Sequence, residues 1–222
     1  MQAKKVNVTD HSKQGQAKKS SEFCVTEPEP ITDTDILIGS EEPLFNKTSE
    51  FQKITIAKNK WWDKVLWLDD VVNCTMKDEF IYHEMIVHVP MMTHKEPKNV
   101  LIVGGGDGGA AREVLKHPSL EKVVMIDIDG EVVEACRKHM PEMSKGAFDH
   151  EKMELIIGDG IDYVKKAKDG TFDVIILDST DPNSDSISEG LFTKEFYENC
   201  VRILTKDGVF TAMTDMPMRY DH

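Results

Sequence analysis

The stretch that decides the fold spans residues 100–109 and reads Val-Leu-Ile-Val-Gly-Gly-Gly-Asp-Gly-Gly. An apolar run enters a glycine loop, and residues 110–115, Ala-Ala-Arg-Glu-Val-Leu, continue with a helical composition. Glycines let such a turn adopt positive φ values and allow the backbone to approach a ligand closely. The order strand, glycine loop, helix predicts the nucleotide-binding corner of a doubly wound α/β sheet.

Asp107 is the unusual member of this loop. A phosphate-binding loop normally presents N–H groups and a helix N-terminus to its anion, whereas a carboxylate repels phosphate and suits a cationic group. The spacing Gly104-x-Gly106-x-x-Gly109 also satisfies the dinucleotide fingerprint, so the glycines alone do not name the ligand. Asp107 argues against a dehydrogenase, because it would face a pyrophosphate.

The composition narrows the class of protein. The 222 residues suffice for one full domain with a small additional element. Lys and Arg number 27 against 40 Asp and Glu, and the resulting net charge of −13 disfavours nucleic acid as a partner. No apolar run approaches the roughly 20 residues that span a membrane. We expect a cytoplasmic protein without a metal site, because CxxC spacing is absent among Cys24, Cys74, Cys136 and Cys200.

Composition and pattern divide the chain into four segments. Residues 1–30, rich in lysine, serine and glutamine, predict a disordered basic tail. Residues 31–76 predict a small N-terminal β-sheet domain of hairpins. Residues 77–97 predict a connecting helix and linker, with Asp78 as the helix N-cap. Residues 98–222 predict a Rossmann-like catalytic domain.

Hydrophobic patterns place the individual elements. In the smaller domain we expect strands at 35–38, 51–57, 64–68 and 71–75, followed by a helix over 79–92. In the larger domain, continuous apolar runs alternate with helical patterns, which indicates a parallel sheet with right-handed crossovers. Its strands are expected at 99–103, 122–127, 153–157, 173–178 and 208–213, and its helices at 109–117, 130–139, 161–168 and 194–204.

Acidic residues follow the first four strands expected in the larger domain, at the edge where such sheets bind ligands. Asp127 lies about 20 residues beyond the glycine loop, where an acid commonly holds a ribose diol. Asp159 beside Gly160 suits an adenine ring, whose amino group a carboxylate accepts. Asp127 or Asp159 alone also has a structural interpretation as the cap of the following helix.

Asp178 and Asp181 end the fourth strand, in Asp-Ser-Thr-Asp. A three-residue offset in a loop can direct both carboxylates into one cleft, where they raise each other's pKa and attract a cation. An alkylamine arrives protonated, since its pKa is ~10. A carboxylate can hold that ammonium and then take a proton from it. A divalent metal is the rival use of such a pair, although no third oxygen ligand lies nearby in sequence.

These motifs together resemble the polyamine aminopropyltransferases, the spermidine synthase family. The resemblance covers roughly residues 33–215 in order. It rests on the glycine loop and on further matching segments, which are Ser49-Glu50-Phe51-Gln52, Leu68-Asp69, Asp78-Glu79-Phe80-Ile81-Tyr82-His83-Glu84-Met85, Val124-Met125-Ile126-Asp127-Ile128-Asp129, Gly158-Asp159-Gly160, Asp178-Ser179-Thr180-Asp181-Pro182 and Gly190-Leu191-Phe192-Thr193-Lys194-Glu195-Phe196-Tyr197.

The resemblance implies transfer of an aminopropyl group from decarboxylated S-adenosylmethionine, as a co-substrate, to a diamine such as putrescine. The products are spermidine and methylthioadenosine, and no metal or tightly bound cofactor is implied. It also implies a homodimer or a higher homo-oligomer. The donor's leaving group is a neutral thioether, so the enzyme mainly has to align amine, carbon and sulfur and keep the amine unprotonated.

The resemblance assigns site residues to both substrates. On the donor side, Asp107 holds the aminopropyl ammonium with Gln52 and His83, beside the loop glycines Gly104 and Gly106. Asp127 takes the place of the ribose-binding acid, and Asp159 and Gly160 match the adenine contacts. On the acceptor side, Asp178 matches the catalytic acid that deprotonates the attacking amine, with Tyr82 and Asp181 as its neighbours.

The chain also departs from the family pattern at several positions, while the donor-side residues largely match it. Asp70 stands where glycine is usual, Asn73 replaces a usual glutamine, and Met213 stands where glutamine is common. The loop 181–190 differs from the usual gate and is two residues longer. The chain ends at His222, before the helix and strand hairpin with which the family continues, so strand 208–213 is expected to be an exposed edge.

Two alternative functions stay open at this point. One is an S-adenosylmethionine-dependent diamine N-methyltransferase, which shares much of this scaffold. The other is a non-catalytic nucleoside-binding or regulatory homologue, which the altered loop 181–190 and the end of the chain at His222 favour. The released nucleoside separates the enzymes, because aminopropyl transfer yields methylthioadenosine and methyl transfer yields S-adenosylhomocysteine.

Overall fold

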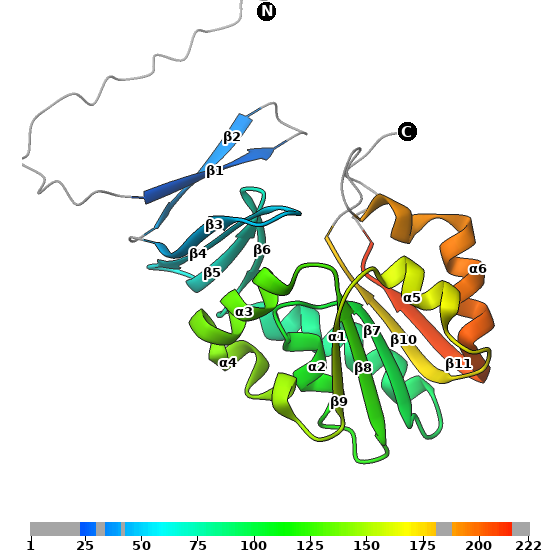
Figure 1. Cartoon of the computed structure of the whole chain (residues 1–222). Helices are drawn as coiled ribbons and strands as arrows, with labels where there is room; N and C mark the ends of the chain where they lie inside the picture. Colours follow the sequence, from blue (N-terminus) through cyan, green and yellow to red (C-terminus); the bar gives the residue numbers. More distant parts are fainter. Residues whose placement is uncertain (1–22, 30–33, 41–42, 181–187, 215–222) are drawn as a thin grey trace, which may run out of the picture.

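The computed structural model describes residues 23–29, 34–40, 43–180 and 188–214 (Figure 1). Its larger part is a five-stranded sheet whose order is β11-β10-β7-β8-β9 and whose neighbours all pair in parallel. This confirms the predicted Rossmann-like fold class. The strands are β7 (Asn99–Gly104), β8 (Lys122–Asp127), β9 (Met153–Ile157), β10 (Phe172–Asp178) and β11 (Leu204–Ala212).

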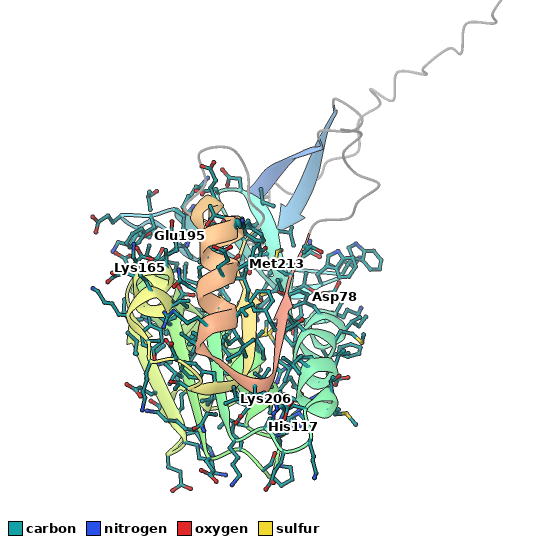
Figure 2. All side chains as sticks on the ribbon, turned by 90° about the vertical axis from the view of Figure 1, so that its right-hand side faces the viewer. Asp78, His117, Lys165, Glu195, Lys206 and Met213 are labelled. Carbon is teal, nitrogen blue, oxygen red and sulfur yellow. The ribbon has the colours of Figure 1, made fainter. Side chains whose placement is uncertain are left out.

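The strand order reverses direction between β7 and β10, which are hydrogen-bonded neighbours. In open α/β sheets the ligand crevice lies at such a switch point, outside the carboxyl ends of the strands. Figure 2 shows Met213, just beyond the end of β11, and Asp78 toward the end of the parallel-sheet region that faces the N-terminal strands, with Lys206 and His117 at its opposite end. The acids that end β8 and β10 therefore belong to the end where a ligand is expected.

Alternate residues of each central strand point to opposite faces, and each face is covered by helices. Val100 and Ile102 pack with Ile86 and Met91 of α1 (Glu79–Thr93). Leu101 and the other residues on the opposite face pack against two other helices, α5 (Gly160–Lys166) and α6 (Lys194–Ile203). Burial on both faces explains why the strands are continuous apolar runs. The remaining helices are α2 (Gly109–Val114), α3 (Gly130–His139), α4 (Pro141–Ser144) and the 3₁₀ turns Ala147–Asp149 and Glu189–Phe192.

The N-terminal region forms two antiparallel sheets. The four-stranded sheet has the order β3-β4-β5-β6, and its inward residues Ile54, Ile56 and Leu66 pack with Met140 and Met143 beside α3 and α4. Figure 1 shows this sheet lying over α3 and α4. A hairpin of two further strands precedes it. The strands are β1 (Phe23–Glu29), β2 (Thr34–Ser40), β3 (Pro43–Thr48), β4 (Lys53–Asn59), β5 (Asp63–Leu68) and β6 (Val71–Thr75).

Several sequence-based expectations need correction. The disordered-tail prediction is wrong for residues 23–29, which pair with β2, while residues 1–22 lie outside the described part. Strand β3 was not predicted, because its residues are mostly exposed and carry little apolar alternation. Asp78 occupies the N-cap position of α1 without capping it, since its carboxylate accepts from the Thr75 hydroxyl at 2.6 Å.

Two further points bear on the family pattern. Asp70, where glycine is usual, has φ +66°, a conformation that favours glycine, and its carboxylate pairs with Lys53 at 2.7 Å. Within the described residues β11 pairs with β10 only, so the expected edge strand is an edge there. In the same part of the chain, no helix is both long and apolar enough to cross a membrane.

Candidate active site

A cavity of about 480 Å³ opens at the carboxyl ends of β7, β8 and β10, with β5, β6 and α1 contributing its other walls. It brings together most of the residues predicted from sequence, and Asp181 lies outside the described residues. Gly106 underlies the cavity without lining it. The predicted residues that line it are Gln52, Tyr82, His83, Gly104, Asp107, Asp127, Asp159, Gly160 and Asp178.

The glycine loop brings β7 and β10 together at the floor of this cavity. Gly104 has φ +87°, and a Cβ there would lie 2.0 Å from the carbonyl oxygen of Asp178. The Gly105 amide donates to that same oxygen at 2.8 Å. At Gly106 a Cβ would lie 2.7 Å from Oδ2 of Asp127. The glycines therefore serve the close approach of two acidic strand ends.

Asp107 and His83 form a buried pair beside the loop. Oδ1 of Asp107 accepts from the Gly109 amide at 2.6 Å and lies 3.4 Å from Nε2 of His83. The other ring nitrogen, Nδ1, lies 2.6 Å from Glu79 Oε2. Burial opposes the charged form of His83, but the charge of Asp107 and the Glu79 hydrogen bond outweigh it and raise the pKa of His83 to about 10. The same imidazolium lowers the pKa of Asp107 against its own burial.

Glu79 is itself held by a buried arginine. Nη1 and Nη2 of Arg112 donate to its two carboxylate oxygens at 3.0 and 2.8 Å, and Arg112 Nε donates to Glu113 at 2.7 Å. Burial raises the pKa of the Glu79 carboxyl, but the hydrogen bonds from His83 and Arg112 lower it by more. The net result is a pKa below the usual value. Glu79 therefore stays ionised, and a chain of contacts runs from Arg112 through Glu79 and His83 to Asp107.

Asp178 presents one engaged and one free oxygen. The Tyr82 hydroxyl donates to Oδ1 at 2.5 Å, whereas Oδ2 is buried without a hydrogen-bond partner among the described residues. Burial and the charge of Asp107 raise the pKa of Asp178 to about 6, against the influence of His83 and Tyr82. A buried carboxylate oxygen without a partner is costly and indicates a place for a donor group.

A second acid, Asp129, connects the smaller domain to this site. Ser49 and Gln52 donate to its Oδ2 at 2.6 and 3.2 Å, and its Oδ1 caps α3. The Gln52 amide nitrogen is thus engaged. Asp127 is not the cap of α3. Burial raises its pKa to about 6, although the Asp129 amide donates to its Oδ1 at 2.9 Å.

Asp159 has the structural role that the sequence left open. Its Oδ1 accepts from the Ile161 amide at 2.8 Å and caps α5, and the residue also lines the cavity. Gly160 is fixed by packing, because a Cβ there would lie 2.6 Å from Val103.

Five carboxylates line the cavity within the described residues, and no lysine or arginine does. They belong to Asp69, Asp107, Asp127, Asp159 and Asp178. Apolar side chains, among them Val103, Ile126 and Leu191, supply the rest of that wall. This combination suits a ligand with a flat apolar portion and a cationic portion. No cluster of three or more metal-ligating side chains occurs within the described ranges.

The sequence analysis gave no role to Glu79, Arg112 or Asp129. Glu79 lies four residues before His83 on one helix, and that spacing places the two side chains on the same face. It was therefore a usable signal. The contacts of Arg112 and Asp129 depend on chain segments more than 30 residues away, which no local pattern indicates.

Two protein-family models match this chain, one over each of its two domains. The model of the spermine/spermidine synthase domain matches residues 79–221, and that of the spermidine synthase tetramerisation domain matches residues 38–76. The chain belongs to the spermine/spermidine synthase family. The resemblance drawn from the motifs is thereby confirmed.

Relatives with curated names agree with this family. A polyamine aminopropyltransferase from Clostridium tetani is 48% identical over 187 residues, covering 84% of this chain and 66% of the relative. One from Thermoanaerobacter sp. is 49% identical over 180 residues, covering 81% and 64%. The chain thus spans slightly less than two thirds of the length of these relatives.

Solved structures of the family share the fold. A spermidine synthase in complex with the transition state analogue AdoDATO is 41% identical with a TM-score of 0.85, covering 94% of this chain and 70% of that one. The spermidine synthase of Thermotoga maritima is 40% identical with a TM-score of 0.82, covering 96% and 70%.

Proposed function

We propose that the protein transfers an aminopropyl group from decarboxylated S-adenosylmethionine to putrescine or a similar diamine. The observation that carries this proposal is the pair of acids Asp107 and Asp178 in one cavity, where Asp178 has a buried oxygen without a partner among the described residues. A site with this charge selects cationic substrates, and both substrates are cations. The names of the relatives support the same activity.

The donor fits the side of the cavity formed by β7, β8 and α5. Asp127 is the acid for the ribose diol, and Asp159 with Gly160 lies where an adenine would be held. Asp107 takes the aminopropyl ammonium, together with His83 and Gln52. Decarboxylation leaves the donor tail purely cationic, so Asp107 attracts it and would repel an intact carboxylate. The donor acts as a co-substrate.

The acceptor fits beside Asp178 and Tyr82, and Asp181 belongs to the same proposal. Asp178 Oδ2 accepts a proton from the attacking amine, whose nitrogen then forms a bond to the carbon next to the sulfonium. The carbon–sulfur bond breaks and its electron pair stays on sulfur, which leaves as neutral methylthioadenosine. A pKa of about 6 lets Asp178 be ionised at neutral pH and still take up a proton.

Product analysis tests this function. The chain is incubated with decarboxylated S-adenosylmethionine and putrescine, and nucleoside and polyamine products are separated. We expect methylthioadenosine and spermidine in equal amounts, and their strong reduction in an Asp178→Asn variant. Formation of S-adenosylhomocysteine from S-adenosylmethionine would instead support a methyltransferase, and binding without any product a regulatory protein.

Assembly and location complete the proposal. We infer a homodimer or higher homo-oligomer, supported by the match of residues 38–76 to a tetramerisation domain. The cytoplasmic location remains a prediction from the sequence. The mass of the protein in solution by light scattering tests the assembly, and a monomer would contradict it.

A further inference from the structure

His83 sits in a rigid, fully buried position between two carboxylates. Its ring packs so closely on the start of α2 that a Cβ at Gly109 would lie 2.3 Å from Cε1. Nδ1 points to Glu79 at 2.6 Å and Nε2 to Asp107 at 3.4 Å. The ring is therefore packed closely against the start of α2, and its two nitrogens have different surroundings.

Glu79 fixes which nitrogen titrates. Two hydrogen bonds from Arg112 keep Glu79 ionised, so Glu79 accepts only and His83 Nδ1 carries a hydrogen. Nε2 is left as the nitrogen that gains or loses a proton. It is buried and has no hydrogen-bond partner in the described part of the chain, although Asp107 lies 3.4 Å away.

Asp107 needs a positive charge in the empty site. Asp107 accepts hydrogen bonds from the Gly109 amide and the Cys74 thiol, and no lysine or arginine in the described ranges lines the cavity. A protonated His83 supplies that charge. A second cation beside Asp107 would repel the imidazolium, whereas a neutral ring offers the Nε2 lone pair to an ammonium group.

We propose that His83 holds a proton against Asp107 before the ligand binds, and that the ammonium group of the ligand replaces this proton on binding. The imidazolium becomes a neutral imidazole, its Nε2 proton passes to solvent, and the ammonium donates to Nε2 and to Asp107. Glu79 acts as the positioning residue that holds the ring for this exchange. The inference rests on the proposed function, since it takes decarboxylated S-adenosylmethionine as the ligand.

The groups around His83 do not titrate in the pH range in which its proton release would be measured. The pKa of His83 is about 10 in the empty site, while that of Asp178 is about 6. Burial and the charge of Asp107 hold the pKa of the Cys74 thiol well above its usual range. Glu79 and Asp107 are ionised, and Arg112 stays protonated. At pH 8 only His83 among these groups is able to release a proton when a cation binds.

Calorimetry in buffers with different ionisation enthalpies measures this release. At pH 8 we expect about one proton per bound decarboxylated S-adenosylmethionine, and affinity that rises about tenfold per pH unit between pH 7 and 8.5. Methylthioadenosine, which lacks the ammonium, is the matched ligand and should release none. Binding of the donor without proton release would overturn the inference and leave the proposed function standing. Absence of donor binding would overturn both.

Two variants distinguish positioning from a general structural role. Glu79→Gln can still accept from Nδ1 but removes the charge, so the proton count at pH 8 should fall below that of the wild type. Glu113→Gln disturbs the same arginine without contacting His83, and its proton count should be unchanged. Equal counts in all three proteins would contradict the role of Glu79. If Glu79→Gln does not fold, the NMR titration of the wild-type His83 ring with and without donor decides, because a bound-state pKa still near 10 refutes the exchange.

Discussion

At the scale of single residues, Asp178 differs from the other acids because one oxygen is held by Tyr82 and the other has no partner among the described residues. Replacing Asp178 with Asn removes the proposed base and keeps the shape of the side chain. We expect kcat to fall by roughly 10²–10⁴-fold with little change in the dissociation constant of the donor. Kinetics and calorimetry on the same preparation measure both quantities, and equal losses in the two would contradict a base role.

The acidic limb of the pH profile follows from the same side chain. The pKa of Asp178 is about 6 in the empty site, and only its ionised form accepts a proton from the amine. The wild-type activity should therefore fall as the pH drops through about 6. Bound cationic substrates lower the pKa of Asp178 and move this midpoint to lower pH.

Asp107 is the residue that we propose to discriminate between donors by charge. We predict that Asp107→Asn, which can still accept from the Gly109 amide, weakens binding of decarboxylated S-adenosylmethionine by roughly 10–100-fold. The preference for this donor over S-adenosylmethionine should narrow, because the repulsion of the second ligand's carboxylate is lost. Competition calorimetry with the two ligands is the measurement. An unchanged preference would remove Asp107 from donor selection.

At the scale of elements, the loop between β7 and α2 depends on close approach to β10. In Gly104→Ala the new Cβ would overlap the Asp178 carbonyl oxygen in addition to the strain of φ +87°. Gly146→Ala is the matched control, since Gly146 has φ +82° and open space around it. We expect about 1 kcal/mol of destabilisation for the control and clearly more for Gly104→Ala, measured by urea unfolding. Equal losses of unfolding free energy in the two variants would show that β10 can shift to accommodate the new Cβ.

The elements also show where sequence patterns suffice. The central parallel strands β7, β8 and β10 were predicted nearly to the residue, because burial on both faces demands unbroken apolar runs. The partly exposed strand β11 begins at Leu204, four residues before its predicted start. Strands β1 and β3 were missed, since antiparallel edge strands need no such run and β3 is mostly exposed. Helix α2 ends at Val114, three residues earlier than predicted. The amides of Lys116 and His117 donate to carbonyls only three residues back, so the last turn tightens, and Pro118 follows it.

The candidate site was predictable for a topological reason. The carboxyl ends of parallel strands meet at one edge, so Asp107, Asp127 and Asp178 had to converge once the strands were right. The contacts that hold these acids in place could not be predicted from the sequence. Asp129 is engaged by Ser49 and Gln52 from about 80 residues earlier, through a packing of two domains that local periodicity does not describe.

At the scale of the whole molecule, the smaller sheet and the parallel sheet share the site. The apolar contact of β4 and β5 with α3 and α4 holds Ser49 and Gln52 against Asp129. A change in this packing would therefore alter the position of Gln52 on the proposed donor side, although the packing residues do not themselves contact the donor. The cavity also concentrates buried acids in a chain whose net charge is already −13, so function and stability oppose each other here.

This opposition predicts that Asp178→Asn makes the protein more stable while it removes activity. The pKa of Asp178 rises from 3.8 unfolded to about 6 folded, so its ionisation costs stability as the pH rises from about 4 to above 6. The variant should gain about 3 kcal/mol over the wild type at pH 7.5 and roughly half as much at pH 5. Urea unfolding of both proteins at the two pH values measures this. A variant no more stable than the wild type at pH 7.5 would show that the carboxylate is not under strain in the folded chain.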